Sequence, residues 1–352
     1  MSNSPQKSPL PKAFFFICLA AGAWYFFKHF EIQGLDRLAV QSKSLTSEGL
    51  FTDATYAKTS SIDWSPKASS DLIVTPVSTT VIESESSRLA PALPPTRNLR
   101  IATWALGGFG PERLESAVVV DRVASVIREF DVMAIQQLRA TQRDFIPYLL
   151  ARASGNGRRY DYILGPTHEP SGEQLAFFFD TARIVTDRTQ LYSVADPDNR
   201  MTHDPLVGWF RAIELDVKSA WTFSLVNVRI ELPMARQETA ELPRILNAVT
   251  RDGRGEDDCL MAGLFQADDV YLLATLGQPQ MRTAIKGIPT DIFARHQTSN
   301  LVFNDVVTTE SLGRGGVVDF LRRENLSLSE AEQVSPYLPV YAEFSIREGG
   351  VQ

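Results

Sequence analysis

The sequence predicts an α/β domain of two packed β-sheets flanked by helices, which spans residues 98–352. Strand-like and helix-like segments alternate through this region, as they do in domains that pack helices on sheets. Several strand-like segments also follow one another directly, so the region is not a simple repeat of strand, helix and strand. With 352 residues, 44% of them hydrophobic, the protein is long enough to bury a large core.

Strands are predicted where short apolar runs lie between polar or turn-forming residues. In chain order these runs cover residues 99–106, 131–138, 160–164, 175–179, 206–217, 223–231, 258–264, 300–306, 316–320 and 339–346. Phe177, Phe178 and Phe179 stand in one continuous apolar stretch, which is typical of a strand that is buried on both faces.

Helices are predicted over residues 111–130, 144–152 and 238–250. The first of them carries apolar residues at helical spacing, namely Leu114, Val118, Val119, Val123, Val126 and Ile127. The glycine-rich run at residues 313–316 lacks the Walker spacing and a following helix that begins with Lys and Ser or Thr. We therefore expect it to be a connecting turn rather than a phosphate loop.

Two further segments precede the domain. Residues 13–27 form an apolar run without a charge between Lys12 and Lys28, and they predict a membrane anchor within residues 1–32. The small residues Ala21, Gly22 and Ala23 also match a signal-cleavage pattern, so a cleaved signal peptide is the alternative. Residues 33–97 are rich in Ser, Thr, Ala and Pro and predict a disordered linker. The domain is then expected outside the cytoplasm, either anchored to the membrane or secreted.

The charge balance argues against nucleic acid as a partner. The chain has 35 Lys and Arg against 42 Asp and Glu, of which 9 and 8 precede residue 98, so the domain carries a net charge of −8. Binding to DNA or RNA depends on neutralising phosphates, which such a domain repels on average.

Few residues of the types that bind zinc are present. Cys18 and Cys259 are too few for a disulfide framework or a zinc site built on thiolates. The histidines available as bases or metal ligands are His29, His168, His203 and His296. The last three stand in loop-like segments without metal-ligand spacing, so composition and spacing predict no metal site.

Six short sequence blocks occur in a fixed order within the domain. They are LRIATWALGGFG at 99–110, DVMAIQQL at 131–138, FSLVNVRIELP at 223–233, CLMAGLFQADD at 259–269, SNLVF at 299–303 and SPYLPVYAEFSI at 335–346. The ordered set resembles the endonuclease/exonuclease/phosphatase superfamily over nearly all of residues 98–346. The resemblance implies a four-layered α/β sandwich, like that of pancreatic deoxyribonuclease, and metal-dependent hydrolysis of phosphoesters.

The residues that perform this chemistry in the superfamily are replaced in the present chain. The resemblance places a metal-binding Glu, a His–Asp pair and phosphate-positioning Asn and Asp residues at positions that are here Ala105, Gln137, Arg229, Leu264, Gln266, Ser299, Pro336 and Tyr337. Gln137 offers an uncharged oxygen, and Arg229 is always protonated and cannot act as a base. The resemblance therefore implies a pseudoenzyme that does not bind the family's magnesium.

Two interpretations of function remain open. The first is a non-catalytic binding or interaction module, whose partner is an unknown protein or a phosphate-bearing ligand held by Arg229, Arg139 and Asn300. The second is an active metal-dependent phosphoesterase or nuclease with a relocated site, built from His203 and the acidic residues Asp257, Asp258, Asp268 and Asp269.

Overall fold

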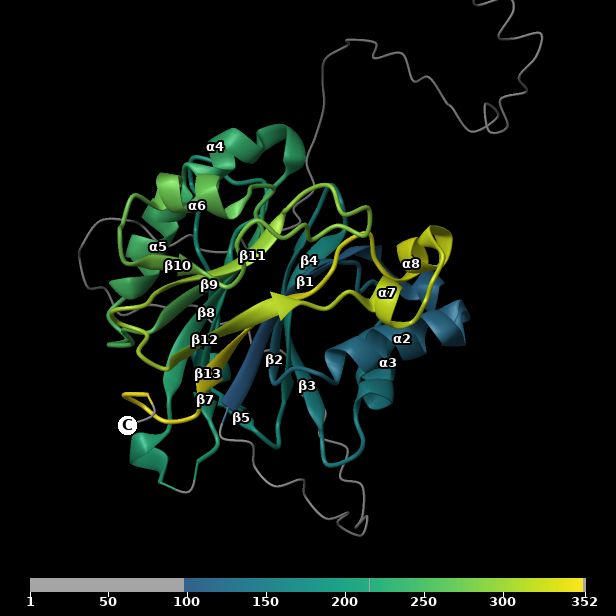
Figure 1. Cartoon of the computed structure of the whole chain (residues 1–352), viewed down its shortest axis with the longest axis horizontal. Coiled ribbons are helices and arrows are strands. Elements are labelled where there is room, and N and C mark those ends of the chain that lie inside the picture. The colour runs from purple at the N-terminus through teal and green to yellow at the C-terminus, as the bar shows by residue number, and fades with distance from the viewer. Residues whose placement is uncertain (1–97, 215, 351–352) are drawn as a thin grey trace, which may run out of the picture. The chain divides into compact units, whose positions relative to one another are not determined.

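The computed structural model of the chain describes residues 98–214 and 216–350. The predicted anchor at 13–27 and the predicted linker at 33–97 lie outside the described residues. Within the described part of the chain, no helix combines the length and the apolar character needed to cross a bilayer. The region that was predicted to fold forms two β-sheets with helices packed around them (Figure 1).

The first sheet contains six strands in the order β12-β13-β1-β2-β4-β3. These strands are β1 (Asn98–Phe109), β2 (Val132–Leu138), β3 (Tyr160–His168), β4 (Glu173–Asp180), β12 (Ser311–Val317) and β13 (Val340–Ser345). Strands β1 and β2 run parallel, whereas the other neighbouring pairs are antiparallel. The carboxyl ends of β1 and β2 therefore meet at one edge of this sheet.

The second sheet has the order β10-β11-β9-β8-β7-β5, with β6 paired to β7 beside it. Its strands are β5 (Ile184–Thr186), β6 (Tyr192–Ser193), β7 (Leu206–Ala212), β8 (Thr222–Arg229), β9 (Cys259–Leu264), β10 (Met281–Thr283) and β11 (Ser299–Asn304). Here β8 and β9 are the parallel pair. Both sheets are thus mixed, as predicted.

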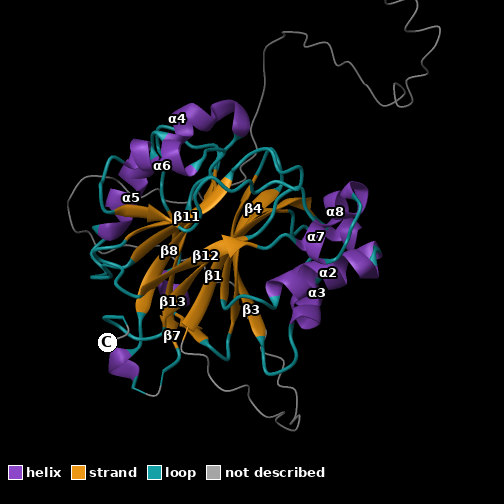
Figure 2. Ribbon diagram, viewed as in Figure 1, coloured by secondary structure: helices purple, strands orange, loops and turns teal. Residues whose placement is uncertain are grey.

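Helices cover the outer face of each sheet (Figure 2). The first sheet packs against α2 (Ala117–Ile127), α3 (Phe145–Ala153), α7 (Phe320–Arg323) and α8 (Leu328–Val334). The second packs against α4 (Ala235–Thr239), α5 (Leu242–Thr250) and α6 (Asp269–Leu276). Short 3-10 helices cover Pro111–Glu115, Arg188–Gln190, Val217–Ser219 and Leu232–Met234. The order helix, sheet, sheet, helix confirms the predicted four layers.

The hydrophobic core consists of three clusters, one between the sheets and one under each helical layer. Successive side chains of a strand point to opposite faces, so a strand covered on both faces must be apolar throughout. In β4, Phe177 and Phe179 enter the central cluster, and Phe178 enters the cluster beneath α2 and α3. The continuous apolar run in the sequence therefore reflects burial on both faces.

Two predicted helices are each divided in the structure. The helix predicted over 111–130 is interrupted at Ser116, which has extended backbone angles and caps α2 by accepting a hydrogen bond from the Val119 amide. The helix predicted over 238–250 is interrupted between α4 and α5, where Pro243 lies in the first turn of α5. Proline is tolerated there because the first amides of a helix have no partner within it.

Two strand predictions also need correction. The strand predicted over 206–217 ends at Ala212. The strand predicted over 316–320 is instead β12, which begins at Ser311, and Phe320 starts α7. The glycine-rich run at 313–316 is therefore part of a strand, not a turn. Its glycines allow close approach, because a Cβ on Gly315 would lie 2.5 Å from the Ala284 carbonyl oxygen.

A polar group joins the two sheets at the centre of the apolar core. Asn227 of β8 is fully buried, and its Nδ2 donates to the carbonyl oxygens of Ile135 and Ala176 in the other sheet, at 3.0 and 2.9 Å. Its Oδ1 accepts a hydrogen bond of 2.7 Å from Nε2 of Gln136. Buried hydrogen bonds of this kind fix one relative placement of the two sheets, since any slip would leave polar groups unpaired.

We expect Asn227→Leu to destabilise the domain by about 3 kcal/mol, because two buried carbonyl oxygens lose this donor and the buried amide of Gln136 loses its shortest hydrogen bond. Chemical denaturation followed by circular dichroism measures this change. The matched control is Asn247→Leu, at an exposed position on α5, for which we expect a change below about 0.5 kcal/mol. Equal stability of the two variants would contradict a structural role for the Asn227 bridge.

Candidate functional site

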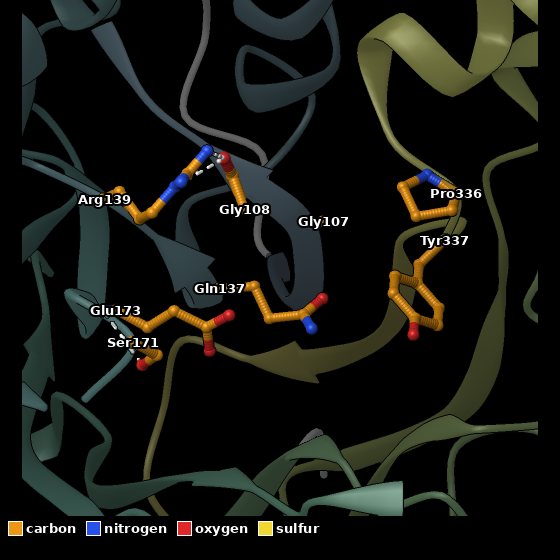
Figure 3. A pocket seen from close by; sticks show the side chains of 8 residues that line it. All are labelled: Gly107, Gly108, Gln137, Arg139, Ser171, Glu173, Pro336 and Tyr337. Carbon is orange, nitrogen blue, oxygen red and sulfur yellow. Dashed lines mark hydrogen bonds between the residues drawn. The ribbon is translucent and has the colours of Figure 1, made fainter. Parts of the chain in front are cut away.

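A cavity of about 380 Å³ opens at the carboxyl ends of β1 and β2. It is lined by Gly107, Gly108, Gln137, Arg139, Ser171, Glu173, Pro336 and Tyr337 (Figure 3). Pro336 and Tyr337 lie across the cavity from Arg139 and Glu173 (Figure 3). The fold thus brings together three of the positions where the resemblance expects catalytic residues, namely Gln137, Pro336 and Tyr337.

The loop that carries Pro336 and Tyr337 is fixed to the end of β1. The hydroxyl of Ser335 donates to the Ala105 carbonyl at 2.7 Å, and the indole of Trp104 donates to the Tyr337 carbonyl at 2.8 Å. Gly107, with φ of +59°, completes the contact, because a Cβ there would lie 2.4 Å from Cδ of Pro336. The cavity wall is therefore held by two side-chain to backbone hydrogen bonds and by the close approach of Pro336 to Gly107.

Gln137 adopts an unusual backbone conformation where β2 enters the cavity. Its φ is 55°, in the left-handed region, and the pairing of β2 with β4 shifts register between Ile135 and Leu138. Gln266, another former catalytic position, has φ of 54°. Such strain is concentrated at functional sites, so both positions retain a backbone suited to presenting a side chain. Oε1 of Gln137 is buried and has no hydrogen-bond partner among the described residues.

A buried cluster of charged residues lies beside the cavity and shares Glu173 with it. Arg229, 5% exposed at the end of β8, approaches two carboxylates. Its Nε lies 3.4 Å from Oε2 of Glu173, and its Nη2 lies 2.8 Å from Oε1 of Glu231. The guanidinium therefore forms ion pairs within the protein at the position where the superfamily is expected to have its histidine.

His203 belongs to the same cluster and is 5% exposed. Its Nε2 lies 3.4 Å from Oε1 of Glu231 and 3.9 Å from Oε2 of Glu173, and its ring centroid is 4.2 Å from that of His168. Burial, together with the nearby Arg229 and His168, lowers the pKa of His203 to about 4, against the opposing effect of Glu231. Burial raises the pKa of Glu173, against the effect of Arg229. At neutral pH the imidazole of His203 is uncharged.

The remaining former catalytic positions do not line the cavity. Ala105, Leu264 and Ser299 are fully buried, and Leu264 of β9 pairs in register with Ser299 of β11. Asn300, retained from the superfamily pattern, is also buried. Its Nδ2 donates to the Ile285 carbonyl at 3.1 Å, and its Oδ1 accepts from the Leu301 amide at 2.9 Å. Asn300 thus contributes to the packing of the second sheet.

The three residues expected to hold an anion are separated in the structure. Arg139 lines the cavity, where it donates to the Gly108 carbonyl and to Oε1 of Glu112, the latter at 2.7 Å. Arg229 is engaged by Glu173 and Glu231, and Asn300 lies in the core. Of the three, only Arg139 faces the cavity, so an anion site there stays a prediction.

The acidic residues proposed for a relocated site do not converge. Asp257 and Asp258 precede β9, and Asp268 and Asp269 follow it, so a six-residue strand of about 20 Å separates the pairs. Asp268 caps α6 through the Tyr271 amide, and Asp269 accepts from the Gly287 amide. His203 lies instead beside Glu173 and Glu231. Sequence reasoning missed these two glutamates, although both stand at strand ends next to buried positions.

Comparison with known proteins supports the resemblance seen in the sequence. No protein-family model matches the chain. Deoxyribonuclease gamma of Mus musculus is 25% identical over 268 residues, which cover 71% of this chain and 85% of that protein. Deoxyribonuclease gamma of Homo sapiens is 22% identical over 261 residues, which cover 69% and 84%.

Two solved structures also align with the chain. An endonuclease/exonuclease/phosphatase from Bacteroides vulgatus aligns with a TM-score of 0.49 at 16% identity, over 71% of this chain and 100% of that chain. The human Nocturnin catalytic domain aligns with a TM-score of 0.46 at 13% identity, over 71% and 94%.

The two-sheet sandwich has the layers that the resemblance to the endonuclease/exonuclease/phosphatase superfamily implies, and the sequence relatives support that resemblance. The chain is similar to deoxyribonuclease gamma along 85% of the length of the mouse protein.

Replacing Arg229 tests the electrostatics of the charged cluster. We expect Arg229→Met to raise the pKa of His203, because a neighbouring cation that disfavours the imidazolium is removed. An NMR titration of the histidine ring signals measures this pKa. Arg236→Met, at an exposed position on α4, serves as the control and should leave it unchanged. If Arg229→Met left the pKa of His203 unchanged, the charge cluster described here would be wrong.

Proposed function

We propose that this protein is a non-catalytic binding module of the endonuclease/exonuclease/phosphatase type, tethered to a membrane by residues 13–27 with its domain outside the cytoplasm. The proposal rests on two side chains, Gln137 and Arg229, whose charges differ from those that the resemblance expects at these positions. Gln137 brings a neutral carboxamide where the resemblance expects the metal-binding carboxylate, and Arg229 brings a buried cation where it expects a histidine. Both changes disfavour a bound divalent cation.

The donor atoms at the cavity do not fit magnesium. Hard cations require several oxygen ligands, and carboxylates usually supply the charge. Among the described residues, Glu173 is the one carboxylate that lines the cavity, and Nε of Arg229 lies 3.4 Å from it. A divalent ion bound by Glu173 would therefore have to displace, or lie close to, a guanidinium.

Hydrolysis would also need a general base within reach of the substrate. Pro336 and Tyr337 stand where the resemblance expects an Asp–His pair. His203 is not among the residues that line the cavity, and its Nε2 faces Glu173 and Glu231. Without a charged metal ligand and without a placed base, the large acceleration of a phosphoesterase has no evident source.

The cavity nevertheless offers polar groups to a small ligand. Gln137 presents a buried oxygen without a partner, and Ser171 and Tyr337 carry hydroxyl groups. The lining contains one cationic residue, Arg139, and one anionic residue, Glu173, so its net charge is close to zero. Such a cavity favours a polar ligand with hydrogen-bond donors over a highly charged anion. A phosphate-bearing ligand would depend on Arg139 and would compete with Glu112 for it. The charge of the domain also disfavours nucleic acid.

A second candidate function is an active metal-dependent nuclease or phosphoesterase with a relocated site. Two observations favour it: its relatives are named deoxyribonucleases, and one ligand atom from each of Glu173, His203 and Glu231 lies within 4.8 Å of the others. Such a site would require Arg229 to leave the cluster, because its guanidinium contacts both glutamates.

A hydrolysis assay separates the two candidates. We expect the full chain in detergent to cleave neither DNA nor a chromogenic phosphodiester above background with Mg²⁺ or Mn²⁺, and Gln137→Ala to behave identically. Metal-dependent turnover that disappears in Glu173→Gln but persists in Glu332→Gln, an exposed control on α8, would instead establish the relocated site.

The membrane tether predicts the size and location of the native protein. We expect the protein isolated from cells to retain residues 1–32 and to sediment with membranes until detergent is added. Intact-mass measurement and N-terminal sequencing test this directly. A mature chain that begins just after Ala23 would show that the segment is a cleaved signal peptide and that the domain is secreted.

A further inference from the structure

Three acidic residues meet at the end of the domain opposite the cavity. β13 starts three residues after Tyr337, which lines the cavity, and ends at Ser345, three residues before Glu348. Asp258 directly precedes β9, and Glu310 directly precedes β12. One carboxylate oxygen from each of Asp258, Glu310 and Glu348 lies within 4.8 Å of the others. Four different parts of the chain therefore converge here, counting Trp221, which directly precedes β8 and contacts Asp258.

Two of these carboxylates are almost completely buried and only half satisfied. Asp258 is 2% exposed and Glu310 is 1% exposed. Oδ2 of Asp258 accepts from the indole of Trp221 at 2.8 Å, and Oε1 of Glu310 accepts from the Gly349 amide at 2.6 Å. The other oxygens, Oδ1 of Asp258 and Oε2 of Glu310, have no hydrogen-bond partner within residues 98–214 and 216–350.

A neutral oxygen adds to this group. The hydroxyl of Thr308 is 1% exposed and likewise lacks a hydrogen-bond partner of good geometry in the described chain. Thr308 stands two residues before Glu310, and its hydroxyl lies near the carboxylate of Asp258. Buried polar atoms are nearly always paired, so the unsatisfied oxygens of Asp258 and Glu310 indicate a missing partner that can accept electron pairs from both.

The negative charge of the cluster also indicates a missing cationic partner. No Arg or Lys in the described part of the chain forms an ion pair with Asp258, Glu310 or Glu348. Burying carboxylates without a counter-charge is costly, and proteins compensate with a proton, a basic side chain or a metal ion.

We propose that Asp258, Glu310 and Glu348, with the Thr308 hydroxyl, form a binding site for a divalent cation, and that calcium is the ion it fits. All the available donors are oxygen atoms, which excludes sites suited to zinc or copper. Calcium accepts irregular sets of carboxylate, hydroxyl and water oxygens, whereas magnesium demands a stricter octahedron. Glu348 is exposed, so water can complete the coordination shell.

Bound calcium would join the last described residues to the second sheet. Gly349 and Glu348 follow β13, while Asp258 and its partner Trp221 directly precede β9 and β8. The site is separate from the cavity and from the superfamily's magnesium chemistry, so its role is structural and does not depend on whether the domain is an enzyme.

Calcium titration of the full chain tests the site. After treatment with a chelator at pH 8, we expect calorimetry to show one bound Ca²⁺ per chain and the melting temperature to rise with Ca²⁺ concentration, as linkage requires for a ligand of the folded state. Asp258→Asn and Glu310→Gln should abolish both effects. Glu348→Gln, at an exposed position where folding is not at risk, should weaken the affinity about tenfold by removing one charged ligand.

The controls decide between calcium and the alternatives. Glu332→Gln on α8 and Glu173→Gln at the cavity should bind Ca²⁺ as the unmodified protein does. The proposal is overturned if millimolar Ca²⁺ neither binds nor raises the melting temperature, or if Glu348→Gln and Asp258→Asn bind it unchanged. A shared proton would occupy the cluster instead if two results were found together. The variants Asp258→Asn and Glu310→Gln would be as stable as the calcium-free protein, and neither they nor the unmodified protein would respond to Ca²⁺.

Discussion

The carboxamide of Asn227 is the contact on which the arrangement of the two sheets depends. It is fully buried in β8 and reaches the backbone of β2 and β4 across the central core. Apolar packing alone tolerates small slips, because it is not directional. Hydrogen bonds in a dry core are directional, and an unpaired carbonyl there is costly. This bridge therefore sets the positions of the strand ends that surround the cavity.

The cavity retains its architecture while its charges have changed. Gly107 and the Ser335 and Trp104 hydrogen bonds hold the walls, and Gln137 keeps a left-handed backbone that presents its side chain. The ion pairs of Arg229 with Glu173 and Glu231 occupy the neighbouring space. A buried ion pair holds its partners firmly, because removing one partner leaves an uncompensated charge. The ion pairs of Arg229 therefore stabilise the wall beside the cavity.

The cluster of Asp258, Glu310 and Glu348 at the other end of the domain differs from the cavity in the balance of its charges. Asp258 and Glu310 are buried without a basic partner in the described residues, and each leaves one oxygen unpaired. At the cavity Arg229 thus neutralises buried carboxylates, and at the other end no side chain of residues 98–214 and 216–350 does so. This contrast is the basis of the proposed cation site at that end.

The sequence by itself determined most of the strands and the two packed sheets flanked by helices, because apolar periodicity is a local signal, and the ordered blocks carried the resemblance that implies four layers. It did not determine where helices break, as at Ser116 and Pro243, since capping and proline override apolar spacing. Only the tertiary structure brought Glu173 and Glu231 to Arg229, and Asp258 to Glu310 and Glu348. Such pairings join residues that are distant in sequence, and electrostatic interaction depends on distance and burial, which no local pattern encodes.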